Sequence, residues 1–136
     1  MKKNNKLNNK GFSLVELIIV IAIMAVLVGV LAPQFTKYVG QSKTSADKSN
    51  IELLRTTACA VLADQECTFS TESSVTYTTN GSKPTEEENG KFLELMEAAI
   101  GTWPETKDNS NGFEIVITKE STGGYTVEVD YASATE

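Results

Sequence analysis

The sequence contains no histidine, and only two cysteines and three prolines among its 136 residues. Without histidine the chain lacks the usual general base, the Ser-His and Cys-His nucleophile pairs, and the commonest transition-metal ligand. It also has no glycine-rich loop of the kind that holds phosphate groups. We therefore predict no catalytic residue, no metal site and no cofactor, and we expect a protein that is not an enzyme.

Positive charge is scarce outside the first eleven residues. The chain has 12 basic and 18 acidic residues, a net charge of −6, and four of the basic residues but no acid lie before residue 12. Without these eleven residues, 8 basic residues would stand against 18 acidic ones, a net charge of −10. Such an acidic chain gives no electrostatic reason to bind DNA or RNA, so no direct nucleic acid binding is expected.

The longest pattern in the sequence is an apolar run from Phe12 to Ala32, which contains a single charge, Glu16. A helix of this length spans roughly 30 Å, the thickness of the hydrocarbon core of a bilayer. Four lysines precede the run, and the next positive charge is Lys37. Because cytoplasmic flanks of membrane helices are enriched in lysine and arginine, we predict one membrane-spanning helix with a cytoplasmic N-terminus.

Two features of this run are unusual for a simple anchor. Glu16 lies one turn into the apolar run, where an ionised carboxylate costs a few kcal/mol or more and usually has a partner. In addition, the polar leader stops abruptly between Gly11 and Phe12. If the chain were cut there, the new α-amino group on Phe12 would lie one helical turn from Glu16, as a partner from the same chain or from a neighbour.

The residues at this junction resemble a known family. From residue 10 to residue 17 they read Lys-Gly-Phe-Ser-Leu-Val-Glu-Leu, and apolar residues follow as far as Pro33. This stretch resembles the class III signal and N-terminal helix of type IV pilins and of their pseudopilin relatives. The resemblance implies that a prepilin peptidase cuts between Gly11 and Phe12 and that Phe12 becomes N-methylated. It also implies that Glu16 guides subunit docking in a helical filament.

Two other interpretations explain part of the pattern. A secretory signal peptide has a shorter apolar core and a small-residue cleavage site, and no Ala-x-Ala lies at the end of this run. A plain single-pass anchor accounts for the lysines and for the length of the run. It accounts neither for Glu16 nor for the Gly11–Phe12 junction.

Pro33 is expected to lie within the helix rather than to end it. Proline loses the hydrogen bond to the carbonyl four residues earlier and crowds it, and that residue is Gly29, which has no side chain. We predict a kink or soft point formed by Gly29 and Pro33. The resemblance suggests that this region loses helical structure when subunits pack in a pilus; a plain kink is the alternative.

After Pro33 the helical pattern becomes amphipathic, which predicts a single helix from near Phe12 to near Ala63. Apolar or small residues recur at three- and four-residue steps, and most charged residues fall on the other face. The predicted inner face is Phe35, Val39, Ser42, Ala46, Leu53, Leu54, Thr57, Ala58, Val61 and Leu62, and the predicted outer face carries Lys37, Lys43, Asp47, Lys48 and Glu52. The first half of this helix has no core to join, so in water it needs other copies of the chain.

Cys59 and Cys67 lie beyond the predicted membrane span, on the side where disulfides persist. Within one straight helix they would be roughly 12 Å apart, too far for a bridge. They can pair if the chain turns back after Ala63. We predict this disulfide, and two buried free thiols are the alternative.

The rest of the chain predicts short elements of both kinds. A strand is expected at residues 75–79, a tight turn at Asn80-Gly81, and a helix that starts with a capping box at residues 85–88 and ends before Gly101. Residues 108–112 lack EF-hand spacing and are expected to form a simple turn. Alternating apolar residues at 113–117 and 125–131, with Gly123-Gly124 between them, predict an antiparallel hairpin packed on the helix from Ile51 to Leu62.

Together these patterns predict an α+β fold, in which a long N-terminal helix packs on a small antiparallel sheet. The leader would comprise residues 1–11 and the helix residues 12–63, with 12–32 first as membrane span and later as filament core. Residues 64–136 would form a C-terminal globular domain.

The predicted function is structural, as a subunit of a type IV pilus. The precursor would cross the cytoplasmic membrane once, be cleaved after Gly11 and polymerise into an extracellular filament. Its expected partners are further copies of itself, the prepilin peptidase, the pilus assembly machinery and the membrane. A pseudopilin of a type II secretion system, a minor or competence pilin and a monomeric membrane-anchored binding domain are alternatives. The sequence leaves open whether the filament serves motility, adhesion or DNA uptake.

Overall fold

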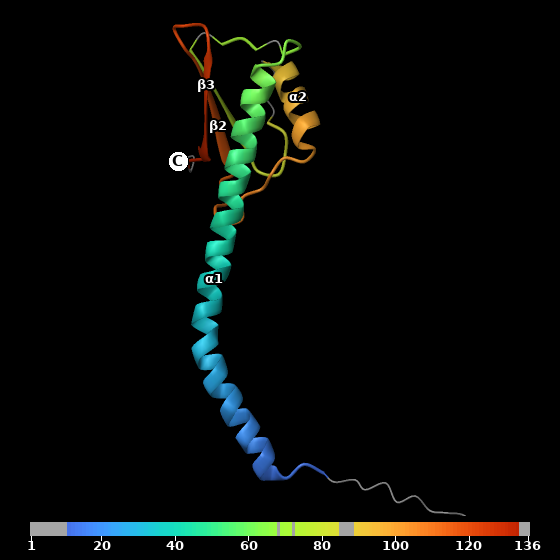
Figure 1. Ribbon diagram of the computed structural model, residues 1–136, viewed down its shortest axis with the longest axis vertical. Helices are drawn as coiled ribbons and strands as arrows, with labels where there is room; N and C mark the ends of the chain where they lie inside the picture. Colours follow the sequence, from blue (N-terminus) through green and yellow to red (C-terminus); the bar gives the residue numbers. More distant parts are fainter. Residues whose placement is uncertain (1–10, 68, 72, 85–88, 134–136) are drawn as a thin grey trace, which may run out of the picture. The chain divides into compact units, whose positions relative to one another are not determined.

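The computed structural model describes residues 11–67, 69–71, 73–84 and 89–133. Its elements follow in the order α1 (Leu14–Leu62), β1 (Ser74–Thr79), α2 (Gly90–Ile100), β2 (Phe113–Lys119) and β3 (Tyr125–Tyr131) (Figure 1). The chain divides into two compact units, residues 1–39 and 40–136, and α1 contributes to both. The fold is α+β, as predicted, with a long N-terminal helix and a small antiparallel sheet.

In the first unit, the described residues are the helical turns of α1 up to Val39 and the three residues that precede them. Every described residue from 11 to 39 is exposed. The helix therefore has no tertiary core here, and only its local hydrogen bonds and side-chain neighbours hold it.

The sheet of the second unit has the order β1-β2-β3, and both pairings are antiparallel. Ile115 of β2 lies opposite Tyr77 of β1 and Val129 of β3. Strand β1 supplies the third strand that the predicted hairpin needed. In the hairpin turn, the N–H of Glu120 donates to the carbonyl of Gly124 (2.8 Å), and Gly123 adopts a φ of 92°.

A single core joins the sheet to both helices of the second unit. The last turns of α1 contribute Leu54, Ala58 and Val61, and the other buried members are Tyr77, Phe92, Leu93, Met96, Trp103, Phe113, Ile115, Ile117 and Val127. Tyr77 stacks on Phe92 at 5.7 Å between ring centroids. Burying each large apolar side chain contributes about 1.5–3 kcal/mol, so this core stabilises the second unit without residues 1–39.

Helix α2 differs from the prediction at its first residues. It begins at Gly90, after Asn89, whose φ is 61°. The predicted capping box at residues 85–88 lies outside the described residues. The predicted end is confirmed, because Gly101 has a φ of 75° and its N–H donates to the carbonyl of Glu97 (2.8 Å).

The inner face of α1 also differs from the prediction. Leu53, which was assigned to that face, is 44% exposed, and Ser42 and Ala46 are exposed as well. Asp47, which was assigned to the outer face, is 0% exposed. Asp47 precedes Leu54 by seven residues, two helical turns, so it lies on the same side of α1 as the core. Its hydrogen bonds, described below, explain how a carboxylate is accommodated there.

Candidate functional site

The Gly11–Phe12 junction lies just outside the first turn of α1. Gly11, Phe12 and Ser13 are not helical, and the side chain of Phe12 is 88% exposed. No atom lies within 4 Å of the position that a Cβ at Gly11 would occupy. A peptidase can therefore reach this peptide bond without unwinding the helix.

Glu16 has a hydrogen-bond partner within its own chain. The N–H of Ser13 donates to Oε2 of Glu16 (2.8 Å), and the N–H of Glu16 donates to Oγ of Ser13 (3.2 Å). This reciprocal pair is a capping box, which satisfies two backbone donors at the start of a helix. The Ser-x-x-Glu signal for this capping box is plain at residues 13–16 of the sequence, although the expectations above do not include it. Any test of Glu16 must therefore separate its charge from its role at the helix start.

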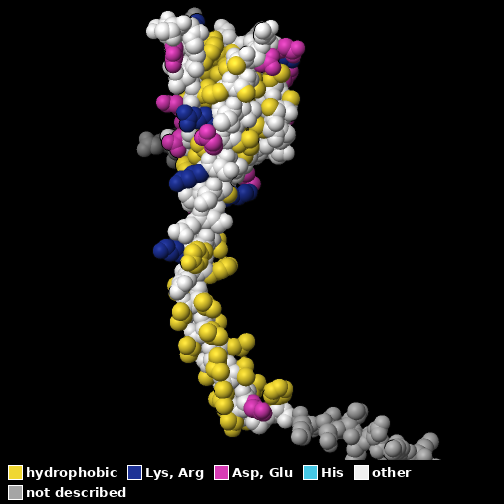
Figure 2. Space-filling model, viewed as in Figure 1, with side chains coloured by type: hydrophobic (Ala, Val, Ile, Leu, Met, Phe, Trp, Pro, Cys, Tyr) yellow, Lys and Arg dark blue, Asp and Glu magenta, His cyan; other side chains and the backbone are white. Residues whose placement is uncertain are grey.

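The apolar surface of α1 surrounds the helix on all sides. Successive residues of an α-helix are 100° apart, so an unbroken apolar run leaves no polar face. From Phe12 to Leu31 the large apolar side chains are between 48% and 88% exposed, and Figure 2 shows them along this part of the helix. Within the described part of the chain, α1 is the only helix long and apolar enough to cross a membrane, judged by length and composition. Such a surface needs lipid or other protein chains around it.

Gly29 and Pro33 lie within α1, which is helical on both sides of them. Apart from the adjacent backbone of α1, no described atom lies within 4 Å of a Cβ built at Gly29, and Thr36 Oγ1 donates to the carbonyl of Pro33 (3.0 Å). Pro33 leaves the carbonyl of Gly29 without its usual donor. The predicted soft point at these two residues stays a prediction.

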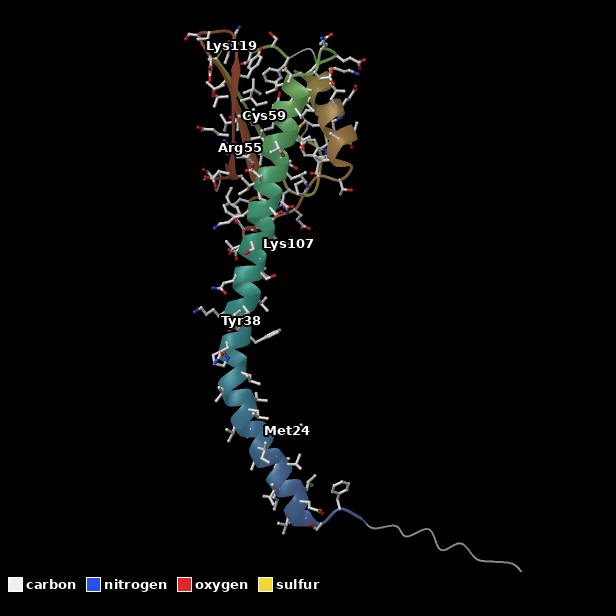
Figure 3. The ribbon with its side chains drawn as sticks, viewed as in Figure 1. Met24, Tyr38, Arg55, Cys59, Lys107 and Lys119 are labelled. Carbon is white, nitrogen blue, oxygen red and sulfur yellow. The ribbon has the colours of Figure 1, made fainter. Side chains whose placement is uncertain are left out.

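Cys59 and Cys67 are free thiols, so the predicted disulfide is absent from this structure. The chain does turn back after Ala63, and the N–H of Cys67 donates to the carbonyl of Asp64 (3.2 Å). The two side chains nevertheless have different surroundings. Cys59 lies on the last turns of α1 (Figure 3), in a hollow lined also by Tyr125. Cys67 packs against the core, and burial, followed by the nearby Asp64 carboxylate, raises the pKa of its thiol.

The buried Asp47 fastens α1 to the loop that leads into β2. Its carboxylate accepts the N–H of Lys107 (2.7 Å) and the N–H of Asp108 (2.9 Å), and the hydroxyl of Tyr131 lies 3.4 Å away. Charge-assisted bonds of this kind compensate for the burial of a carboxylate. Partial burial, and then the Asp47 and Asp108 carboxylates, raise the pKa of Tyr131. In the sequence, the only sign of this anchor was the position of Asp47, seven residues before Leu54.

The loop at residues 108–112 forms a turn rather than an EF-hand. The N–H of Asn111 donates to Oδ1 of Asn109 (2.9 Å), and Gly112 has a φ of 90°. Across the described ranges of the chain, no three His, Cys, Asp or Glu side chains are placed to hold a metal ion.

Comparisons with known proteins found one family model and several pilin relatives that are similar to this chain. The family described as the prokaryotic N-terminal methylation motif matches residues 6–32. The type IV major pilin protein PilA of Myxococcus xanthus is 36% identical over 58 residues, 43% of this chain and 26% of that protein. Prepilin peptidase-dependent protein A of Clostridium perfringens is 33% identical over 82 residues, 59% of each chain. The type IV major alpha-pilin of Moraxella bovis is 29% identical over 140 residues, 92% of this chain and 88% of that protein.

No solved structure matches the chain. The match to the first two relatives is partial, since the chain spans about a quarter of one and about three fifths of the other. The matched motif contains Gly11, Phe12 and Glu16, the residues that carried the resemblance in the sequence. The resemblance to type IV pilins is therefore confirmed.

Proposed function

Because this chain has the N-terminal segment of a type IV pilin, we propose that it is a structural subunit of a type IV pilus. The observation that carries the proposal is the surface of the first half of α1. Large apolar side chains are exposed on every side of this segment, and its apolar run contains one charged residue, Glu16. A bilayer covers this surface in the precursor, and the same segments of neighbouring subunits cover it in the filament. The chain itself performs no catalysis.

Processing follows from the exposed junction in front of α1. A prepilin peptidase cuts between Gly11 and Phe12, and Phe12 is then N-methylated. The Clostridium relative is named for its dependence on such a peptidase, and the matched family for N-terminal methylation. Cleavage removes the four leader lysines, which hold the N-terminal end of the helix on the cytoplasmic side. The mature helix can then leave the bilayer more easily for the filament.

Glu16 guides assembly by changing its partner. In the precursor its carboxylate accepts the N–H of Ser13. After cleavage, the amino group of Phe12 supplies a positive charge one turn away, on the same chain or on a neighbour. An ion pair with a neighbour satisfies the carboxylate inside an apolar filament core and fixes the axial position of the incoming subunit.

Assembly through the N-terminal helix also assigns roles to the other segments of the chain and to its partners. Residues 12–63 are the segment that contains α1, and residues 64–136 complete the globular domain displayed on the filament surface. Further copies of the chain, the pilus assembly machinery and the membrane are its partners. A pseudopilin or a minor pilin would share the same N-terminal segment, and abundance in sheared filaments separates a major pilin from both.

The test is the intact mass and the N-terminal sequence of the protein sheared from the cell surface. We expect a chain that starts at N-methylated Phe12 and is a major component of the sheared fraction. A chain that stays in the membrane and still starts near Met1 would overturn the proposal and leave a monomeric anchored domain. Correct processing without surface filaments would point to a pseudopilin.

A further inference from the structure

Three asparagines in this chain are followed by glycine: Asn80, Asn89 and Asn111. An Asn-Gly pair is the sequence most prone to spontaneous deamidation, because glycine has no side chain to shield its backbone nitrogen. That nitrogen attacks the side-chain carbon of asparagine, so the reaction needs the amide group free to turn. The three pairs have the same local chemistry, so differences between them come from the fold.

The fold immobilises Asn80. Its side-chain nitrogen donates to the carbonyl of Ser110 (3.0 Å), and its side-chain oxygen accepts the N–H of Thr106 (3.3 Å). The attacking nitrogen is occupied too, because the N–H of Gly81 donates to the carbonyl of Pro104 (3.0 Å). Deamidation at this pair would require all three hydrogen bonds to open together.

The fold also restrains Asn89. Its side-chain oxygen accepts the N–H of Ser70 (2.8 Å). Its backbone carbonyl accepts the N–H groups of Phe92 (3.0 Å) and Leu93 (3.3 Å), which fixes the peptide group that precedes Gly90 at the start of α2. Rotation of the side-chain amide would break the bond from Ser70, and rotation of the peptide group would break the bonds from Phe92 and Leu93.

Asn111 has no such restraint. It is exposed, and its side-chain amide has no hydrogen bond to any of the residues that the structure describes; its backbone N–H donates to Oδ1 of Asn109 (2.9 Å). Within the described ranges, the N–H of Gly112 donates no hydrogen bond either, while its carbonyl accepts the N–H of Ala132 (2.9 Å). Both reacting groups of this pair are therefore available.

Gly112 cannot be exchanged for a residue that would slow the reaction. A Cβ at this position would lie 2.4 Å from the carbonyl oxygen of Thr79, and the φ of 90° already disfavours any other residue. The fold thus keeps a labile pair at the entrance to β2 because the backbone needs glycine there. We propose that Asn111 is the deamidation site of the folded chain, and that Asn80 and Asn89 are protected by the fold.

The reaction needs only a base and water. A base removes the proton of the Gly112 N–H, and the nitrogen attacks Cγ of Asn111. A new C–N bond closes a five-membered succinimide ring, and the side-chain nitrogen leaves as ammonia. Water then opens the ring at either carbonyl and gives aspartate or isoaspartate. Both products add one negative charge, and isoaspartate lengthens the backbone by one carbon in front of β2. The pairing of Gly112 with Ala132 is then disturbed.

The test ages the purified full-length chain, folded in detergent, in warm and mildly alkaline buffer. Tryptic peptides separate the sites, because residues 108–119 carry Asn111 whereas residues 56–91 carry Asn80 and Asn89. Mass spectrometry measures deamidation, and enzymatic methylation measures isoaspartate. We expect modification to accumulate several times faster in the peptide with Asn111. In denaturant, the three pairs should react at similar rates.

Two results would overturn the proposal. One is faster modification at Asn80 or Asn89 than at Asn111 in the folded chain. The other concerns the variant Asn111→Gln, whose longer side chain forms a ring much more slowly. If the 108–119 peptide of this variant still deamidates at the original rate, then Asn109 is the reacting residue. Neither result depends on whether the chain assembles into a filament.

Discussion

The two units of the molecule differ in which kinds of side chain they expose and which they bury. In the first unit, the described leucines, isoleucines and valines are between 38% and 73% exposed, and no described residue is buried. In the second unit, a charged residue, Asp47, is 0% exposed, and its carboxylate accepts backbone N–H groups of the loop before β2. The polar group is buried where backbone donors are available to satisfy it, and the apolar groups are exposed where the chain offers them no partner.

This contrast shows which unit can be stable in a single chain without partners. The second unit contains its own sheet, its own helix and an anchor between α1 and the loop before β2. The first unit has only local hydrogen bonds along one helix, so its stable environment must come from outside the chain.

A fragment that begins at Gly40 should separate the two units completely. We expect residues 40–136 to be monomeric in water and to unfold cooperatively on heating, because all the buried core residues lie within it. The full-length chain should need detergent under the same conditions. Size-exclusion chromatography and circular dichroism measure both properties, and an aggregated or non-cooperative fragment would contradict the division.

Substitutions at Glu16 should abolish or sharply reduce surface filaments without preventing membrane insertion. Glu16→Ala removes both the charge and the capping box, whereas Glu16→Gln keeps a capping-box side chain and removes the charge alone. Ser13→Ala is the matched control, because it breaks the box and leaves the charge. We expect filaments only from Ser13→Ala when sheared pili are counted by electron microscopy.

One result for these three variants would contradict the proposed role of the Glu16 charge. Filaments from Glu16→Gln, together with none from Ser13→Ala, would show that the helix start matters and the charge does not. In that case, the proposed exchange of partners at Glu16 would be wrong.

The substitution Asp47→Ala should destabilise the second unit by about 1–3 kcal/mol, because it removes the charged acceptor of two partly buried hydrogen bonds from the N–H groups of Lys107 and Asp108. Urea unfolding of the 40–136 fragment measures the change. Tyr131→Phe is the control; it removes only the long contact at 3.4 Å and should cost less. Equal losses from both variants would mean that the loop is not anchored through Asp47.

The substitution Gly112→Ala should lower stability by more than about 1 kcal/mol, because alanine is strained at a φ of 90° and its Cβ would clash with Thr79. Gly124→Ala offers a matched change in the hairpin turn. There the nearest atom to the new Cβ lies 3.7 Å away, and we expect little effect. If the two variants melt at the same temperature, the close approach of Gly112 to β1 is not as described.

The smallest effect concerns the two thiols. The pKa of Cys67 is raised by burial and by Asp64, so less of it is thiolate at neutral pH, and it should react with maleimide more slowly than the exposed Cys59. Raising the pH should increase the rate at Cys67. No labelling of either cysteine before reduction would show that a disulfide forms in the cell-surface protein.

Periodicity predicted the elements of this fold well where it was strong. Alternation of apolar and polar residues predicted the hairpin at residues 113–131 and the strand at 75–79. Gly101 predicted the end of α2, because glycine readily adopts the positive φ found there. The resemblance at residues 10–17 located the junction and Glu16. These signals are local, so a single sequence is enough to read them.

Signals that depend on distant contacts were misread. Asp47 was assigned to the outer face because a charge normally faces water, and its partners are 60 and 61 residues away. The predicted disulfide depended on a chain reversal after Ala63, which is present, but Cys59 and Cys67 are free thiols in this structure. The capping box at residues 13–16 is different, because it was readable and was overlooked beside the stronger apolar signal.

The long-range contacts of Asp47 also determine how late in translation the second unit can finish folding. Tyr131, near its carboxylate, and β3, which completes the sheet, are made about ninety residues after the apolar part of α1. At 5–20 residues per second, the ribosome needs roughly 5–20 s to make this stretch. During that interval the apolar helix has already emerged, and the globular unit cannot yet close. The translation order therefore lets the helix find its apolar surroundings before any folded domain exists to compete for it.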